Sequence, residues 1–428
     1  MNTKAYPRVN EVLHTEVLPN GLEVRIVPKP GFSKTYAVFS TRYGSIDNQY
    51  IAGDGSQVTL PDGIAHFLEH KMFAEPDGDV FLSFAEKGAS ANAFTSFDRT
   101  AYLFSATDHI DDNLDTLLNF VQHPYFTDEN VEKEKGIIGQ EIQMYQDQPD
   151  WRVYYGLIEA MYASHPIYID IAGTIESISK IDKETLYACY ETFYHPANMS
   201  LFIVGGVEPE SVMARIRTNQ AAKSFKPYTE VERIFPVEQP GVRERERVIA
   251  LPVSLPKCLF GFKEPITEPL QPDEMLHREL ATKLLFDILF SQSGQIYQTL
   301  YEENLISDSF GYDYQASEQY AYSMIGGDTR DPELLIARTR ELLGIVQVSG
   351  IQEAEFNRVK KKRIGNYLRM FNSPEAIANE YTKYRFRQID FFEFLAVYEA
   401  LTLVDIQKRY EDHFNWEQLA SSIVRSPS

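Results

Sequence analysis

The stretch from Gly63 to Phe73, GIAHFLEHKMF, constrains this chain most, because it places two histidines and a glutamate at helical spacing. Each residue of an α-helix turns by about 100°, so His66 and His70 lie on one face, one turn apart. Glu69 projects into the same sector of the helix. Two neutral imidazoles on one face provide half of a zinc site, and a carboxylate beside them can take a proton from a metal-bound water.

A His-x3-His pair on a helix is also common as a surface or packing feature, so the pair alone leaves both interpretations open. Two features favour zinc. The remaining histidines of the nine in the chain show no comparable helical pairing, and Asp62-Gly63 precedes the motif as expected of a helix start. The order His-x-x-Glu-His is also the inverse of His-Glu-x-x-His and is known as a catalytic zinc motif.

A second acidic group lies on a helix predicted from about residue 128 to beyond 145. Glu134 and Glu141 are two turns apart and share a face of this helix within about 20°. Either glutamate could simply belong to an acidic helix start, where the helix dipole favours negative charge. Glu141 fits that explanation less well, because it is expected on the same face as Ile137 and Ile138.

Length, charge and cysteine content exclude several classes of protein. A chain of 428 residues is expected to form two or more domains. Its net charge of -21 argues against a nucleic-acid partner. No apolar run approaches the roughly 20 residues that span a bilayer, and the N-terminal residues show no secretory signal. Cys189 and Cys258 suggest no disulfide framework, so we expect a cytoplasmic protein.

The order of predicted elements in the second half repeats that of the first. In the first half, strands at 22–27 and 35–40 precede the motif helix, and two further strands follow it. In the second half, a strand at 257–262 precedes a long helix at 272–290, and strands near 309–314 and 320–326 are followed by helices to the C-terminus. A stretch with proline and glycine but no periodicity lies between the halves. We therefore predict domains at 1–220 and 248–428, joined by a linker at 221–247.

Together these features resemble the insulinase/pitrilysin family of inverted-motif zinc peptidases, which includes the mitochondrial processing peptidases. The resemblance covers nearly the whole chain. Within the family, the chain looks like a bacterial branch of similarly short proteins. Besides the zinc motif, it rests on four segments: Asn92-Ala93-Phe94-Thr95, Glu134-x6-Glu141, Gly173, and Pro196-x-Asn198-Met199 to Gly205. It implies an α+β fold of two homologous domains, each a mixed, mainly antiparallel sheet with helices packed on it (the mitochondrial processing peptidase/LuxS-like metallohydrolase fold).

The resemblance also implies roles for the motif residues. His66, His70 and Glu141 would bind one zinc ion per chain, and Glu69 would act as the general base that activates a zinc-bound water. Glu134 would orient a ligand histidine from behind. The 1–220 domain would then be the catalytic one. The second domain would carry no metal site, because leucine and alanine follow His277 at the third and fourth positions.

A substrate site is implied on the strand after the motif helix. Asn92, Ala93 and Thr95 would lie on an edge strand that pairs with an extended peptide and leaves the choice of side chains loose. Without the resemblance, an ordinary strand explains Ala93 and Thr95 equally well.

One departure from the family concerns the partner. The second half-molecule of active members usually supplies an arginine and a tyrosine that hold the substrate carbonyl. Here Tyr301 stands where the arginine is expected, and Asp308 or Ser309 stands near the position of the tyrosine. Tyr312 and Tyr314 could compensate only by a shift in register. We therefore expect a heterodimer with a related zinc-less chain, with a homodimer as the alternative.

The function expected from these features is that of a zinc metalloendopeptidase subunit acting on peptides or small unfolded polypeptides. A dedicated maturation peptidase for a secreted peptide precursor is an alternative that the residues do not distinguish. A non-proteolytic scaffold of the same fold is a second alternative, but scaffold members typically lose a motif residue and this chain retains all of them.

Overall fold

A computed structural model describes residues 1–76, 78–266 and 270–427, which form two compact units. Unit 1 consists of Met1–Ile142, Ile169–Phe235 and Arg369–Phe386. Unit 2 consists of Gln143–Tyr168, Pro236–Leu368 and Arg387–Ser428. One of the points where the chain passes between the units, residues 235 and 236, lies within the stretch expected to be a linker. The predicted domain ranges themselves stay a prediction.

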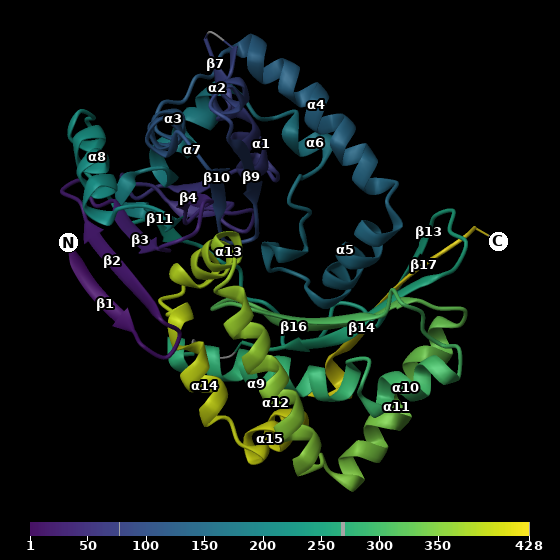
Figure 1. Cartoon of the computed structure of the whole chain (residues 1–428). Helices are drawn as coiled ribbons and strands as arrows, with labels where there is room; N and C mark the ends of the chain where they lie inside the picture. The colour runs from purple at the N-terminus through teal and green to yellow at the C-terminus, as the bar shows by residue number, and fades with distance from the viewer. Residues whose placement is uncertain (77, 267–269, 428) are drawn as a thin grey trace. The chain divides into compact units, whose positions relative to one another are not determined.

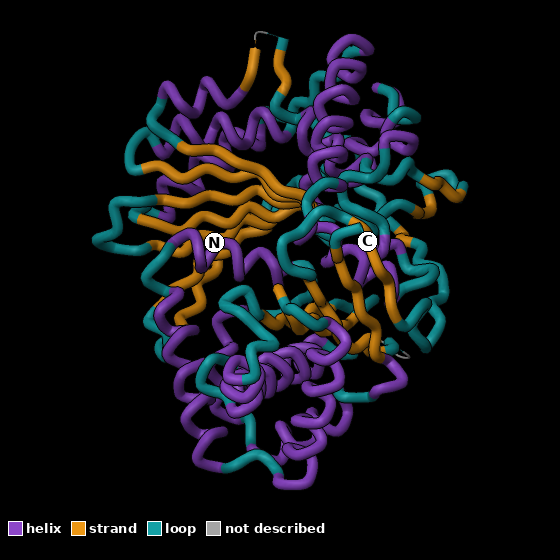
Figure 2. The backbone as a smooth tube through the Cα atoms, turned by 90° about the vertical axis from the view of Figure 1, so that its right-hand side faces the viewer, coloured by secondary structure: helices purple, strands orange, loops and turns teal. Residues whose placement is uncertain are grey.

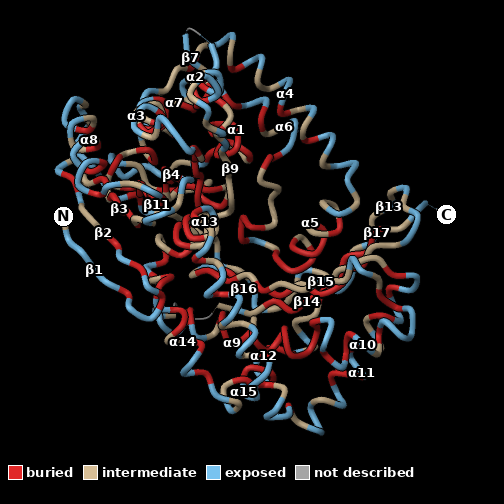
Figure 3. Tube along the Cα trace, viewed as in Figure 1, coloured by how far each residue is buried: buried red, intermediate tan, exposed pale blue. Residues whose placement is uncertain are grey.

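Unit 1 is built on a seven-stranded mixed sheet (Figure 2). In sheet order its strands are β1 (Asn2–Tyr6), β2 (Glu11–Val17), β3 (Glu23–Pro28), β11 (Met199–Gly205), β4 (Thr35–Thr41), β10 (Thr100–Ala106) and β9 (Ser90–Thr95). β11 runs parallel to β3, and every other neighbouring pair is antiparallel. All residues of β4 and β11 are buried, so elements cover both faces of the sheet centre (Figure 3). β9 lies at the edge.

Helices pack on this sheet and carry the motif. The motif helix α1 (Ile64–Lys71) lies against β9 and β10 (Figure 1). The long helix α4 (Asp128–Gln146) starts at a reciprocal cap, in which Thr127 and Asn130 each bond the other's backbone N–H. The remaining helices of this part of the chain are α2 (Val80–Glu86), α3 (Ile110–Val121), α6 (Ile175–Ile178), α7 (Lys183–Phe193) and α8 (Pro209–Ala221).

Unit 2 is built on a five-stranded sheet that repeats part of the first. In sheet order its strands are β13 (Glu246–Ala250), β17 (Leu419–Arg425), β14 (Lys257–Glu264), β16 (Ala321–Asp328) and β15 (Gly311–Ala316). β17 is parallel to β13 and all other pairs are antiparallel, as in the series β3-β11-β4-β10-β9. This shared topology confirms the predicted duplication and fold class. The prediction of helices up to the C-terminus is wrong, because the chain ends in β17, the second strand in the order of its sheet.

The helices of unit 2 come from three separate stretches. They are α5 (Pro149–Met161), α9 (Pro272–Phe290), α10 (Gln295–Glu302), α11 (Pro332–Ser349), α12 (Glu353–Met370), α14 (Phe394–Ala400) and α15 (Leu403–His413). α5 packs on β14 and β17 so closely that a Cβ on Gly156 would lie 2.4 Å from the Ser422 hydroxyl. None of the helices that the structure describes is long and apolar enough to cross a membrane.

Each unit therefore contains a helix from the other half of the chain. α5 precedes the linker but belongs to unit 2, whereas α13 (Pro374–Arg385) follows it and packs on β4 and β11 of unit 1. Tyr381 of α13 stacks on Phe202 with ring centroids 4.4 Å apart. Arg385 donates two hydrogen bonds to the Glu23 carboxylate, at 2.7 and 2.8 Å. The two halves of the sequence are thus not the two units.

Candidate metal centre

The start of α1 is held in place by two glycines in the left-handed backbone region. Gly63, directly before the helix, has φ 87°, and a Cβ there would lie 2.4 Å from the carbonyl oxygen of Ala172. Gly173 has φ 72°, and a Cβ there would lie 2.5 Å from the carbonyl oxygen of Asp62. The two backbones approach too closely for any side chain at either position, which explains why glycine stands at both.

α1 buries its apolar residues and aligns its polar ones. Phe67 and Leu68 are fully buried in unit 1. His66 and Glu69 are only 9% and 8% exposed. The rings of His66 and His70 are adjacent, with centroids 4.5 Å apart, as their spacing predicts.

Glu141 meets the two histidines from α4. Its Oε2 lies 3.8 Å from Nε2 of His66 and 3.6 Å from Nε2 of His70. The three ligand atoms all lie within 4.8 Å of one another. Among the residues that the structure describes, this is the one group of three or more His, Cys, Asp or Glu side chains close enough to hold a metal ion. The family resemblance implied that these three residues meet, and in the structure their ligand atoms lie together.

The donor set fits zinc. Zinc–ligand bonds of about 2.0–2.2 Å at tetrahedral angles place the ligand atoms about 3.3–3.6 Å from one another. The separations of 3.6 and 3.8 Å between Glu141 and the histidines are close to this range and longer than a hydrogen bond. Two imidazoles and one carboxylate are also the ligands of one common type of catalytic zinc site, which keeps a fourth position open.

Glu134 supports His70 from the side opposite to the ligand atom. Its Oε1 lies 3.2 Å from Nδ1 of His70, and its Oε2 lies 3.2 Å from Nζ of Lys71. Burial raises the pKa of Glu134, but the hydrogen bond with His70 and the charge of Lys71 outweigh burial, and the net shift is downward. An ionised carboxylate only accepts, so Nδ1 of His70 carries the proton and Nε2 is left with its lone pair.

The face of α4 that carries both glutamates differs in one detail from the prediction. Ile138 and Ile142 are buried, whereas Ile137 is exposed. The prediction that Ile137 shares the buried face with Glu141 is therefore wrong. On the helical wheel the two isoleucines flank the glutamates on opposite sides, Ile138 about 40° from Glu134 and Ile137 about 40° from Glu141, and only the side of Ile138 and Ile142 is buried.

The general-base candidate is buried and bonded to the edge strand. The Thr95 hydroxyl on β9 donates a hydrogen bond to Oε2 of Glu69 at 2.9 Å. Burial raises the pKa of Glu69 to about 6, even though the Thr95 hydrogen bond opposes this shift. Burial lowers the pKa of His66 to about 4, with the charge of His70 contributing in the same direction. His66 is thus neutral near pH 7, as a metal ligand must be.

β9 is the edge strand that the family resemblance implies. It pairs with β10 on one side only, and Asn92 is exposed on it. The Asn92 side-chain oxygen accepts a hydrogen bond from the backbone N–H of Ala93 at 2.9 Å. A strand with one unpaired side can accept a further strand. Peptide binding by Asn92, Ala93 and Thr95 stays a prediction.

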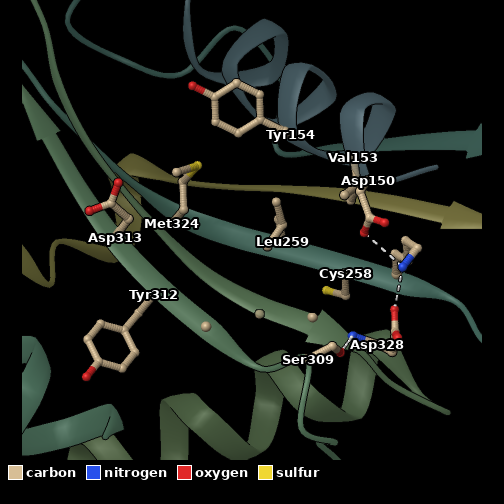
Figure 4. Close-up of a pocket in the computed structure, with 14 residues that line it drawn as sticks. Asp150, Val153, Tyr154, Cys258, Leu259, Ser309, Tyr312, Asp313, Met324 and Asp328 are labelled. Atoms are coloured by element: carbon tan, nitrogen blue, oxygen red, sulfur yellow. Dashed lines mark hydrogen bonds and ion pairs between the residues drawn. The ribbon is translucent and has the colours of Figure 1, made fainter. Parts of the chain in front are cut away.

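The tyrosines of unit 2 are engaged elsewhere in their own unit. The Tyr312 hydroxyl donates to Asp287 at 2.9 Å, and the buried Tyr314 hydroxyl donates to Glu264 at 2.8 Å. Tyr312 lines a cavity of about 300 Å³. Its hydroxyl is directed away from Tyr154 (Figure 4). Tyr301 on α10 is half-exposed and stacks on Tyr297. Neither Tyr312 nor Tyr314 presents a free hydroxyl within the unit.

Two contributors to the site were missed from the sequence. Lys71 is the last residue of α1, and a lysine between the second histidine and the apolar pair Met72-Phe73 was a signal that it has a buried partner. Gly63 was noted only as part of a helix start. Its contact with residues 172 and 173 depends on a loop more than a hundred residues away, which no local pattern reveals.

Comparisons with known proteins agree with this geometry. A sequence profile of the insulinase family (peptidase family M16) matches residues 54–175, and the profile of the M16 inactive domain matches residues 180–363. The uncharacterized zinc protease YmfH of Bacillus subtilis (strain 168) is 49% identical over 416 residues, which are 97% of this chain and 96% of that protein. The resemblance to short bacterial members is thereby confirmed.

More distant relatives and solved structures extend the match. A mitochondrial-processing peptidase beta subunit of Arabidopsis thaliana is 26% identical over 217 residues, which are 50% of this chain and 39% of that protein. The crystal structure of an M16-like peptidase from Alicyclobacillus acidocaldarius superposes with a TM-score of 0.94 at 41% identity, covering 97% of this chain and 99% of the other. On these grounds the chain belongs to the M16 insulinase family of zinc proteases.

Proposed function

We propose that this chain is a zinc metalloendopeptidase subunit that hydrolyses peptides or small unfolded polypeptides. The observation that supports the proposal most is the convergence of His66, His70 and Glu141, from two helices, beside the buried carboxylate of Glu69. A packing role would not require three ligand atoms to face one another at separations too long for hydrogen bonds.

The residues divide the chemistry among them. His66, His70 and Glu141 would hold the zinc ion, which when bound lowers the pKa of water and polarises the peptide carbonyl. Glu69 accepts a proton from the attacking water as the water oxygen bonds to the carbonyl carbon. The same carboxyl then delivers that proton to the amide nitrogen as the C–N bond breaks. The Thr95 hydroxyl orients the Glu69 carboxylate by donating a hydrogen bond to its Oε2.

The substrate would bind along β9. Backbone N–H and C=O groups on the unpaired side of this edge strand can add an extended peptide as an eighth strand. Because Thr95 lies on β9 and bonds Glu69, a peptide on β9 lies next to the general base. Main-chain hydrogen bonds of this kind do not depend on the side chains of the peptide, so the enzyme would accept many peptide sequences. Asn92 and Ala93 would contact the substrate.

A partner chain would complete the active site. Tyr301 stands where the family resemblance implies an arginine, and the hydroxyls of Tyr312 and Tyr314 are already bonded to carboxylates. A heterodimer with a related zinc-less chain that supplies arginine and tyrosine would provide the missing donors for the substrate carbonyl. A homodimer is the alternative. The acidic composition and the two free cysteines support a cytoplasmic location.

The test of the proposed function combines metal analysis with one substitution. Purified chain should contain about one zinc per molecule, and Glu69→Gln should retain zinc while losing at least about a hundredfold in peptide cleavage. Glu132→Gln is a matched control on the exposed face of α4 and should change neither. A wild-type chain that binds no zinc, or a Glu69→Gln variant that cleaves normally, would refute the proposal.

A further inference from the structure

Lys71 occupies a position where lysine is seldom found. It follows His70 on α1 and is only 3% exposed. A lysine this deeply buried is almost always paired, because an unpaired buried ammonium is costly. The Lys71 ammonium lies 3.2 Å from Oε2 of Glu134, and within the described part of the chain no other hydrogen bond or ion pair engages it.

Glu134 uses its two oxygens in two directions. Oε2 binds Lys71, and Oε1 lies 3.2 Å from Nδ1 of His70. The carboxylate is itself only 13% exposed. One carboxylate of α4 therefore contacts two consecutive residues of α1, and both contacts depend on its orientation. With Nδ1 of His70 held in this way, Nε2 faces Glu141 at 3.6 Å.

We propose that Lys71 is a positioning residue for the zinc ligand His70, acting through Glu134. The ammonium holds the second carboxylate oxygen, so that the first stays aligned with Nδ1 of His70. The inference rests on the proposed zinc site and adds to it a residue that touches neither the ligand atoms nor the base.

Two effects of losing this ammonium oppose each other. Removing a positive charge lowers the electrostatic repulsion on a nearby metal ion and so favours its binding. However, the charge of Lys71 is already balanced by Glu134 at 3.2 Å, so little of it acts on a metal ion. Without Lys71, the buried carboxylate of Glu134 has no counter-charge and gains hydration by turning towards solvent, which leaves His70 without its partner. Loss of orientation therefore dominates, and zinc binding should weaken.

The test measures zinc affinity of the full-length, zinc-free chain by competition with a chromophoric chelator. Lys71→Met should weaken zinc binding about tenfold, as other losses of ligand support do. Lys71→Arg keeps the ion pair and should stay within about threefold of wild type. Lys135→Met is the matched control, since half-buried Lys135 of α4 pairs with Glu132 and the Ser179 carbonyl rather than with the proposed site, and it should leave zinc affinity unchanged.

A double-mutant cycle separates this role from simple stabilisation. In a Glu134→Gln background, Lys71→Met should change zinc affinity less than about twofold, because the link to His70 is already broken. If Lys71 only stabilises the fold, Lys71→Met lowers the melting temperature of the zinc-free chain and leaves zinc affinity unchanged, which overturns the proposal. Equal effects of Lys71→Met in both backgrounds also overturn it.

Two further outcomes remain distinguishable. If Lys71→Met does not fold, Lys71→Gln serves in the same cycle, because its shorter neutral side chain cannot form the ion pair. If the wild-type chain itself binds no zinc, the proposed function fails. If wild type binds zinc tightly and Lys71→Met binds it equally well, only the role of Lys71 fails.

Discussion

The hydrogen bond from Thr95 to Glu69 shows how a single residue can serve two parts of the site. Thr95 lies on the edge strand β9, where a substrate is proposed to pair, and its hydroxyl reaches the buried base at 2.9 Å. A hydrogen bond to a carboxylate favours its charged form, whereas burial favours the neutral form. In Glu69 burial is the larger effect, and its pKa is raised to about 6.

Thr95→Val removes the hydroxyl and keeps the shape of the side chain. The pKa of Glu69 should rise further, because the hydrogen bond that opposes its upward shift is lost. A general base works when deprotonated, so activity falls as the pH drops through this pKa. In Thr95→Val the acidic limb of the pH–activity profile should therefore move to higher pH by about half a unit to one unit. The pH profile of kcat/KM measures the shift.

Thr95→Ser is the control for this prediction, because it retains the hydroxyl and should keep the wild-type limb. An unchanged acidic limb in Thr95→Val would show that the hydroxyl does not tune Glu69. If Thr95→Val instead lowers activity equally at all pH values and the acidic limb stays at its wild-type pH, Thr95 acts in substrate binding alone.

At the scale of elements, α1 carries three of the proposed site residues, and its position depends on the backbone contact between Gly63 and the loop at 172–173. This contact is between backbone atoms, the Ala172 carbonyl and the left-handed Gly63, so no side chain can move to relieve a clash. Ser177 strengthens it by donating a hydrogen bond to the Asp62 carbonyl at 2.8 Å. The motif helix is thereby fixed at its beginning before any metal binds.

Gly63→Ala should destabilise unit 1 and reduce its zinc content. The new Cβ would meet the Ala172 oxygen at 2.4 Å, and φ 87° is strained for alanine, so a loss of about 2–4 kcal/mol is expected. Thermal unfolding of the zinc-free chain and zinc analysis measure the two effects.

Gly139→Ala provides the comparison for Gly63→Ala. Gly139 lies within α4, and a Cβ there would meet nothing within 4 Å. Alanine favours a helix over glycine, so this variant should be stabilised by up to about 1 kcal/mol and retain zinc. If Gly63→Ala behaved like Gly139→Ala, the backbone contact would not determine the position of α1.

At the scale of the whole molecule, the candidate metal ligands lie in one of two units of the same topology. Unit 1 carries the His66, His70 and Glu141 group, and the described part of unit 2 carries no comparable one. The helix α9 holds the place of α1 between strands β14 and β15, but leucine and alanine occupy the positions after His277 where a second histidine would be needed. Within the described residues, the duplicated fold therefore carries one candidate metal site.

The partner proposal predicts that the chain alone is a poor catalyst. With a fluorogenic peptide, addition of a related chain that carries the arginine and tyrosine should raise the rate by about 10²–10³, the usual contribution of an oxyanion donor. The Glu69→Gln variant plus the same partner should remain inactive, which shows that the zinc-binding chain supplies the base. Full activity of the chain alone would contradict the proposed need for a partner.

The local elements of the site could be predicted from the sequence because they depend on periodicity. A helix repeats every 3.6 residues, so the placement of His66, Glu69 and His70 on α1 followed from their spacing. Strand β3 was likewise visible from its period-two alternation, and β4, β10 and β14 were visible as short strand-like segments. β17 was missed, since a short apolar strand after a helix resembles one more helical turn.

What spacing could not decide was which distant elements meet. From the residues alone, Glu141 was one glutamate of an acidic helix, and only the family resemblance paired it with His66. The tertiary structure brings their ligand atoms to 3.8 Å and places Glu134 between His70 and Lys71. It also exchanges α5 and α13 between the halves of the chain. Backbone periodicity is a local property, whereas these contacts depend on how buried surfaces pack, so the sequence determined the helix and the fold determined the site.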